Sequence, residues 1–249
     1  MKPSIITSKL KRALIYCIWL LLWQLLYLAI GKEVLVPAPF HTFTKLLEMM
    51  GTRDFYLQIA GTLYRVLVGM GASFVLAIIS SYMAYKYFFF RDFIKPMVSF
   101  MKSTPVMAII ILALLWCKSE QVPILVCFLM CYPLIYTNIL AGLLELKKGF
   151  KELSQVYEVS PFYYLTECVL PQLKPYLGAA LQLGIGMAFK VVIAAEVLAI
   201  PHYAMGYQLL DAKIYLDTTE VFAWMIVIIF LSQLCENLVS LLLTERRRT

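Results

Sequence analysis

The chain has 249 residues, of which 62% are hydrophobic and only 15% are charged. A soluble domain carries about a quarter charged residues, and so large an apolar excess cannot all be hidden in one globular core. The net charge of +7 comes from short basic clusters between long apolar runs. This distribution argues against nucleic acid as a partner and predicts an all-α protein that spans a lipid membrane.

Six apolar runs predict about six transmembrane helices in one membrane domain formed by residues 1–249. The first run follows Lys9, Lys11 and Arg12, as in a signal peptide, but it is long and no small-residue cleavage site follows it. We therefore expect it to be retained as a span. The six expected spans are residues 13–30, 59–85, 93–116, 122–144, 176–200 and 221–243.

Local patterns predict how these spans pack. Small residues recur every fourth position in the second and fifth runs, which predicts close approach of a neighbouring helix. They are Gly69, Ser73, Ala77 and Ser81, and then Ala180, Gly184 and Ala188. In the third run, Pro105 removes a backbone donor and predicts a kink or a break. Most lysine and arginine residues fall on the side of the N-terminus, so we expect both termini in the cytoplasm.

The segment of residues 145–174, between the fourth and fifth runs, is predicted to be cytoplasmic and partly helical. Its pattern predicts two short helices, Lys151–Val159 and Pro161–Val169, and Leu170-Pro171 is expected to close the segment before the fifth span. Ser160 is suited to cap the second helix, with Pro161 at its first position. The pattern fits a docking element for a cytoplasmic partner and an amphipathic loop on lipid headgroups equally well.

This segment resembles the loop of permease subunits of binding-protein-dependent ABC importers, with the pattern E-A-A, three residues, G, nine residues, I, x, L-P. Glu152 and Leu170-Pro171 match at the same spacing. The chain departs from the pattern at the two alanines, the glycine and the isoleucine, where it has Leu153, Ser154, Glu158 and Cys168. Where the pattern has a glycine turn, Ser160-Pro161 can supply another turn.

The resemblance extends from Leu35 to Arg246 and is greatest to the nitrate/sulfonate/taurine branch, which includes carriers of vitamin precursors. It rests on Val36-Pro37-Ala38-Pro39, Thr62 to Val66, Tyr132-Pro133-Leu134, Lys190 with Glu196-Val197-Leu198, Gly206-Tyr207, Ala212 to Leu216, and Glu220 to Ala223. It implies a type I importer fold in a bacterial cytoplasmic (inner) membrane. It also implies a small solute of the sulfonate, nitrate, taurine or vitamin-precursor class.

The same resemblance implies three protein partners: a second, identical permease copy, a cytoplasmic ABC ATPase and an external solute-binding protein. The ATPase contact would involve Glu152, Leu153, Ser154, Tyr157, Glu158, Ser160 and Pro161. The chain has no G-x-x-x-x-G-K-[ST] sequence, so we expect ATP hydrolysis by the partner and no enzyme activity of its own. No cofactor and no metal site are expected, because the two histidines are isolated and the cysteines lie in or beside apolar runs.

Three ionisable residues within the runs are candidates for the solute pathway: Arg65, Lys190 and Glu196. Lys190 and Glu196 lie about 240° apart around a helix, so a direct pair is not expected. Each could contact solute in a water-filled path, or bond a polar neighbour such as Gln182, Asn138 or Glu236. Arg65 could attract an anionic solute or extend to the membrane interface.

Two other classes of function remain open from the sequence. A stand-alone channel or secondary carrier would need its own set of intramembrane charges or an internal repeat, and neither is found. A membrane-embedded enzyme would need clustered catalytic side chains, which the spacing of the few polar residues does not provide. Both alternatives would work without an ATPase, which separates them from the importer.

Overall fold

The computed structural model describes residues 5–146, 154 and 156–244, and within them every regular element is a helix. This confirms the predicted all-α class. In chain order the elements are α1 (Ile5–Ile30), α2 (Pro39–Met50), α3 (Arg53–Lys86), α4 (Phe88–Ser103), α5 (Val106–Trp116), α6 (Val122–Leu144), α8 (Pro161–Tyr164), a π-helical turn (Leu165–Val169), α9 (Leu170–Ala199), α10 (Met205–Ile214) and α11 (Thr218–Thr244).

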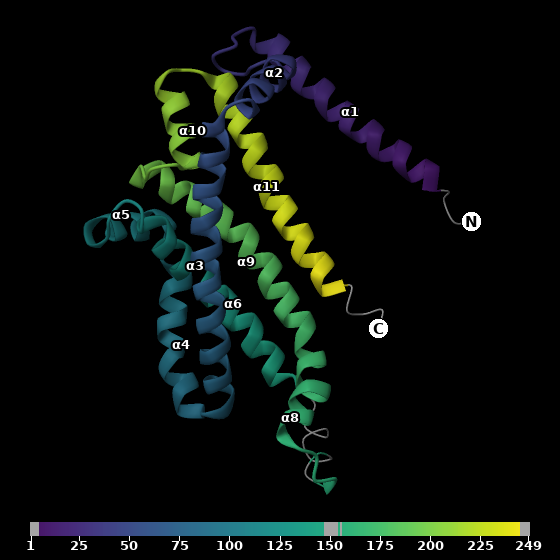
Figure 1. Ribbon diagram of the computed structural model, residues 1–249, viewed down its shortest axis with the longest axis vertical. Helices are drawn as coiled ribbons and strands as arrows, with labels where there is room; N and C mark the ends of the chain where they lie inside the picture. Colours follow the sequence, from purple (N-terminus) through teal and green to yellow (C-terminus); the bar gives the residue numbers. More distant parts are fainter. Residues whose placement is uncertain (1–4, 147–153, 155, 245–249) are drawn as a thin grey trace.

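The core of the molecule is a bundle of α3, α6 and α9 (Figure 1). The small residues of α3 face α6, where the Ser73 hydroxyl donates to the carbonyl of Phe128 at 3.1 Å and Ser81 donates to that of Tyr136 at 3.1 Å. A β-carbon on Gly69 would lie 2.7 Å from that of Cys127. Only a residue without a side chain permits this separation of α3 and α6, which confirms the predicted stripe of small residues.

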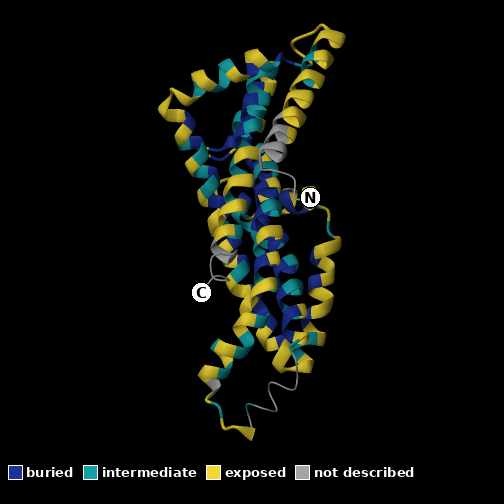
Figure 2. Cartoon of the chain, turned by 90° about the vertical axis from the view of Figure 1, so that its right-hand side faces the viewer, coloured by how far each residue is buried: buried dark blue, intermediate teal, exposed yellow. Residues whose placement is uncertain are grey.

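The stripe on α9 is buried as well, with Ala180 and Ala188 fully covered. The Cys131 thiol of α6 lies 3.6 Å from the carbonyl of Gly184, so α9 approaches α6 closely at this stripe. Figure 2 shows that buried residues gather along the length of this central bundle. The bundle is therefore the rigid frame on which the outer helices are placed.

The third expected span is broken at the predicted place. Helices α4 and α5 meet at a bend of 103°. Thr104 and Pro105 form the break, both with extended backbone, because Pro105 has no amide hydrogen to continue the helix. Four described helices are long and apolar enough to cross a membrane, and the bent pair could make a fifth. The count of six and the cytoplasmic termini stay predictions.

Helix α1 diverges from the bundle (Figure 1). The Trp23 indole donates to the carbonyl of Pro37 at 3.1 Å and stacks on the ring of Phe222 at 5.7 Å. From Leu14 to Leu22, on the N-terminal side of Trp23, the side chains of α1 are exposed. The apolar part of this helix, Leu14–Ile30, is shorter than the four spanning helices.

The helix that contains the fifth expected span begins earlier than residue 176. Leu170-Pro171 was expected to close the polar segment, but helix runs without interruption from α8 through the π-helical turn into α9. This expectation was wrong because the π-helical turn directly precedes the proline, and its wider ring of hydrogen bonds lets the helix absorb a residue without a donor. The continuous helix Phe162–Ala199 has 38 residues.

Candidate functional site

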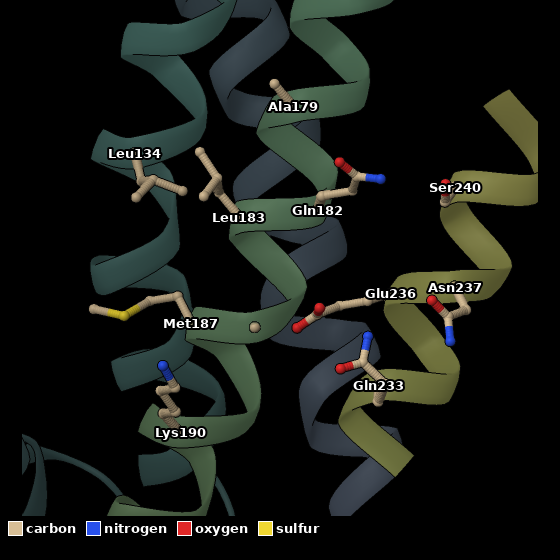
Figure 3. A pocket seen from close by; sticks show the side chains of 11 residues that line it. Leu134, Ala179, Gln182, Leu183, Met187, Lys190, Gln233, Glu236, Asn237 and Ser240 are labelled. Atoms are coloured by element: carbon tan, nitrogen blue, oxygen red, sulfur yellow. The ribbon is translucent and has the colours of Figure 1, made fainter. Parts of the chain in front are cut away.

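An open groove of about 770 Å³ lies between the bundle and α11 (Figure 3). One face of α9 and one face of α11 form its walls, because their polar residues recur three or four positions apart. The groove is lined by Leu134, Ala179, Gln182, Leu183, Gly186, Met187, Lys190, Gln233, Glu236, Asn237 and Ser240. A surface with this many polar side chains does not face lipid, so the groove must contact water or another protein surface.

The groove holds one positive and one negative side chain. Lys190 of α9 is exposed, whereas Glu236 of α11 is half-buried. The carboxylate of Glu236 points at α9 (Figure 3), where a β-carbon on Gly186 would lie 2.8 Å from its Oε1 atom. Among the described residues, neither Lys190 nor Glu236 takes part in any ion pair within 4.0 Å.

The other two candidate charges do not line this groove and are joined to each other. Arg65 of α3 donates from Nη1 to Glu196 Oε1 at 3.0 Å and to the carbonyl of Tyr203 at 2.9 Å. Its Nη2 atom donates to Glu120 Oε2 at 2.6 Å and to the carbonyl of His202 at 2.7 Å. The side chains of Arg65 and Glu196 are 4% and 0% exposed. Arg65 thus ties α9 and two loops to α3, and its side chain is buried among these partners.

Glu196 receives two further hydrogen bonds. The Thr62 hydroxyl and the amide of Gly206 both donate to Oε2 at 3.0 Å. Close approach of α3 to the loop after α9 makes this possible, since a β-carbon on Gly61 would lie only 2.0 Å from the carbonyl oxygen of Tyr203. The buried carboxylate is therefore both charge-paired and hydrogen-bonded, which is the condition under which a buried charge is stable.

Glu196 does bond a polar partner on a neighbouring helix, which was one of the two alternatives for it. The examples named were Gln182, Asn138 and Glu236, but its partners are Arg65, Thr62 and Gly206. Arg65 is 131 positions away along the chain, and no local pattern signals such a pair. The expectation that Lys190 and Glu196 face different ways is confirmed, because Lys190 is exposed in the groove and Glu196 is buried.

Glu120 joins this network from the loop between α5 and α6, with its side chain 54% exposed. Its Oε1 atom accepts a hydrogen bond from the amide of His202 at 2.5 Å, in addition to the contact with Arg65. Burial acts to raise the pKa of Glu120. The hydrogen bonds from Arg65 and His202, together with the charge of Arg65, outweigh burial and hold the pKa below its ordinary value. Sequence reasoning missed Glu120, which lies in a short polar connection without a motif.

The described part of the polar segment forms the end of the molecule opposite α2 and α10 (Figure 1). Glu158 adopts a φ of 51°, the left-handed conformation that glycine favours. The amide of Val159 donates to the carbonyl of Ser154 at 2.9 Å, which ends the preceding helical turn as a left-handed cap does. The chain therefore keeps a sharp turn at this position although it carries a glutamate there.

The next helix begins as predicted. The Ser160 hydroxyl accepts a hydrogen bond from the amide of Tyr163 at 3.3 Å, and α8 starts at Pro161. Tyr157 and Phe162 are 75% and 76% exposed, so this end presents aromatic side chains to its surroundings. Glu152 and Leu153 lie outside the described residues.

Three comparisons with known proteins agree with this arrangement. Residues 73–246 match the family described as binding-protein-dependent transport system inner membrane component. The aliphatic sulfonates transport permease of Bacillus subtilis is 21% identical over 239 residues, covering 94% of this chain and 85% of the relative. The nitrate import permease of Synechocystis is 25% identical over 213 residues, covering 82% of this chain and 76% of the relative. The taurine transport system permease of Escherichia coli is 23% identical over 243 residues, covering 95% of this chain and 86% of the relative.

The fold is shared with solved structures at much lower identity. Inward-facing structures of the MetNI methionine ABC transporter include a chain that superposes with a TM-score of 0.60 at 16% identity. The superposition covers 76% of this chain and 95% of that one. This likeness supports the type I importer fold.

Proposed function

Because this chain belongs to the family of binding-protein-dependent transport system inner membrane components, and is thus a permease subunit of an ABC importer in a bacterial inner membrane, we propose that its groove forms half of the solute pathway. Two identical copies, each a single transmembrane domain, would bring their grooves together. The observation that carries this proposal is Lys190, which is exposed within a transmembrane helix. A charged side chain is stable at that position only if it lies in a water-filled path or contacts a facing subunit.

Arg65 and Glu196 take a different part in this proposal. Their pair fixes the end of α9 that the charge distribution assigns to the outside, so it shapes the path without touching solute. Lys190 is the residue that contacts solute. An ammonium group suits the oxyanions named for the relatives, the sulfonates and nitrate, and the solute is assigned to the sulfonate, nitrate, taurine or vitamin-precursor class.

The energy for transport comes from a separate ATPase that docks on the segment around α8. Support for this contact comes from the exposed Tyr157 and Phe162 and from the sharp turn at Glu158. The docking residues proposed are Glu152, Leu153, Ser154, Tyr157, Glu158, Ser160 and Pro161. An external binding protein delivers solute at the opposite end.

The proposal is tested by purifying the tagged chain in mild detergent from its native membrane and identifying its partners by mass spectrometry. A P-loop ATPase is expected to co-purify. Replacing Glu152 and Tyr157 together by alanine should lower both ATPase recovery and transport, while membrane insertion is unchanged. Normal recovery of the ATPase by that double variant would refute the docking site.

A second arm tests the groove. Lys190→Met should reduce solute uptake into proteoliposomes without reducing ATPase recovery. Lys213→Met, which removes an exposed lysine outside the groove, is the matched control. Transport by the chain alone, without any ATPase, would support a stand-alone carrier or channel instead.

A further inference from the structure

The two charged residues of the groove are held apart on different helices. Lys190 belongs to α9 and Glu236 to α11, and among the described residues neither is part of an ion pair within 4.0 Å. A charge within a membrane is costly unless a partner or water compensates it. Two opposite charges that share one groove without neutralising each other are both available to a third group.

Gly186 sets where the negative charge is presented. Its missing side chain lets the Glu236 carboxylate approach α9, where a β-carbon would lie 2.8 Å from Oε1. Lys190 is four residues further along the same face of α9, which is about 6 Å of helix. The groove therefore offers a negative and a positive contact about one helical turn apart, flanked by the carboxamides of Gln182 and Gln233.

We infer that the groove accepts a zwitterionic solute, whose anionic end contacts Lys190 and whose ammonium end contacts Glu236. This inference rests on the proposed function, because it requires the groove to be the solute path. A plain oxyanion that reached Lys190 would lie near the like charge of Glu236, and like-charge contacts in a confined site are unfavourable. A solute with an ammonium group a few bonds from its anionic group satisfies both residues.

The charge of the assembled pathway leads to the same solute class. Each copy of the chain contributes one lysine and one glutamate to the groove, so two copies add no net charge to the cavity between them. Such a cavity does not concentrate anions as a basic one would. Selection then depends on matching two charges at once, which a solute with one charge cannot do.

The test measures solute binding to the intact permease–ATPase complex in nanodiscs, without the binding protein, by saturation-transfer NMR. The probes are taurine and ethanesulfonate, which share the sulfonate and differ in the ammonium group. Wild type is expected to bind taurine more tightly. Glu236→Gln should weaken taurine binding about tenfold, as expected for loss of a charged contact, and leave ethanesulfonate binding equal or stronger.

Gly186→Ala provides a second variant that keeps every charge. The new methyl group must displace the Glu236 carboxylate, so the preference for taurine should fall while the complex stays assembled. Asp92→Asn, which removes an exposed acid of α4 outside the groove, is the control and should keep the wild-type preference. Recovery of the ATPase with each variant shows that the protein is folded.

A wild-type complex that binds ethanesulfonate as tightly as taurine would overturn the inference. So would Glu236→Gln and Gly186→Ala variants that both keep the wild-type ratio. These outcomes are distinct from failure of the proposed function, which would appear as a wild-type chain that recovers no ATPase. If the ATPase is recovered and the two probes are not distinguished, only the zwitterion assignment fails.

Discussion

Replacing Arg65 by methionine is the sharpest test of the buried network. The substitution keeps most of the side-chain volume but removes the partner of Glu196, whose side chain is 0% exposed. Breaking a buried pair from one side costs about 3–5 kcal/mol, because it leaves an uncompensated charge in the protein interior. At roughly 2–4 °C per kcal/mol for a chain of this size, the melting temperature should fall by roughly 6–20 °C.

The assay is thermal unfolding of the purified chain in detergent, followed by fluorescence-detected size exclusion. Arg53→Met is the control, because Arg53 is the first residue of the same helix and is exposed. A double variant, Arg65→Met with Glu196→Met, removes the stranded carboxylate and should recover part of the lost stability. An Arg65→Met variant that melts with the wild type, or a double variant less stable than the single one, would refute this reasoning.

Two further predictions concern the same end of the molecule. Gly61→Ala should destabilise the chain in the same unfolding assay, because its β-carbon would lie 2.0 Å from the backbone carbonyl of Tyr203; unchanged melting would contradict the close approach. The lowered pKa of Glu120 means that its contacts with Arg65 and His202 stabilise the fold above its ordinary pKa of 4.5 and are lost as pH falls through the lowered value. The melting temperature should therefore fall on acidification below about pH 4.5, and less so in Glu120→Gln; identical pH profiles for the two proteins would count against this role.

Much of the fold follows from local sequence signals. Apolar runs locate α6 and most of α3 and α11, and the lack of a donor at Pro105 locates the bend between α4 and α5. The capped start of α8 follows from Ser160 and Pro161. Each of these signals depends on a few neighbouring residues, so no knowledge of the folded chain is needed.

The contacts that build the site could not be predicted in the same way. Arg65 and Glu196 are individually conspicuous, but nothing local distinguishes a residue that contacts solute from one that pairs with a distant charge. Glu120 and the carbonyl of Tyr203 join them only because the folded bundle brings three segments together. The close contact of Gly186 with Glu236 depends on how α11 docks against α9.

The unbroken helix from α8 to α9 joins the segment around α8 to the groove through one continuous element. Its far end is tied to α3 by the bond between Glu196 and Arg65. Pro161 lies about 52 Å along the helix from Glu196, whereas Lys190 lies only about 9 Å from it. A displacement at α8 would therefore reach Lys190 along helix alone, without crossing a loop, and would have to work against the packing of α9 on α6.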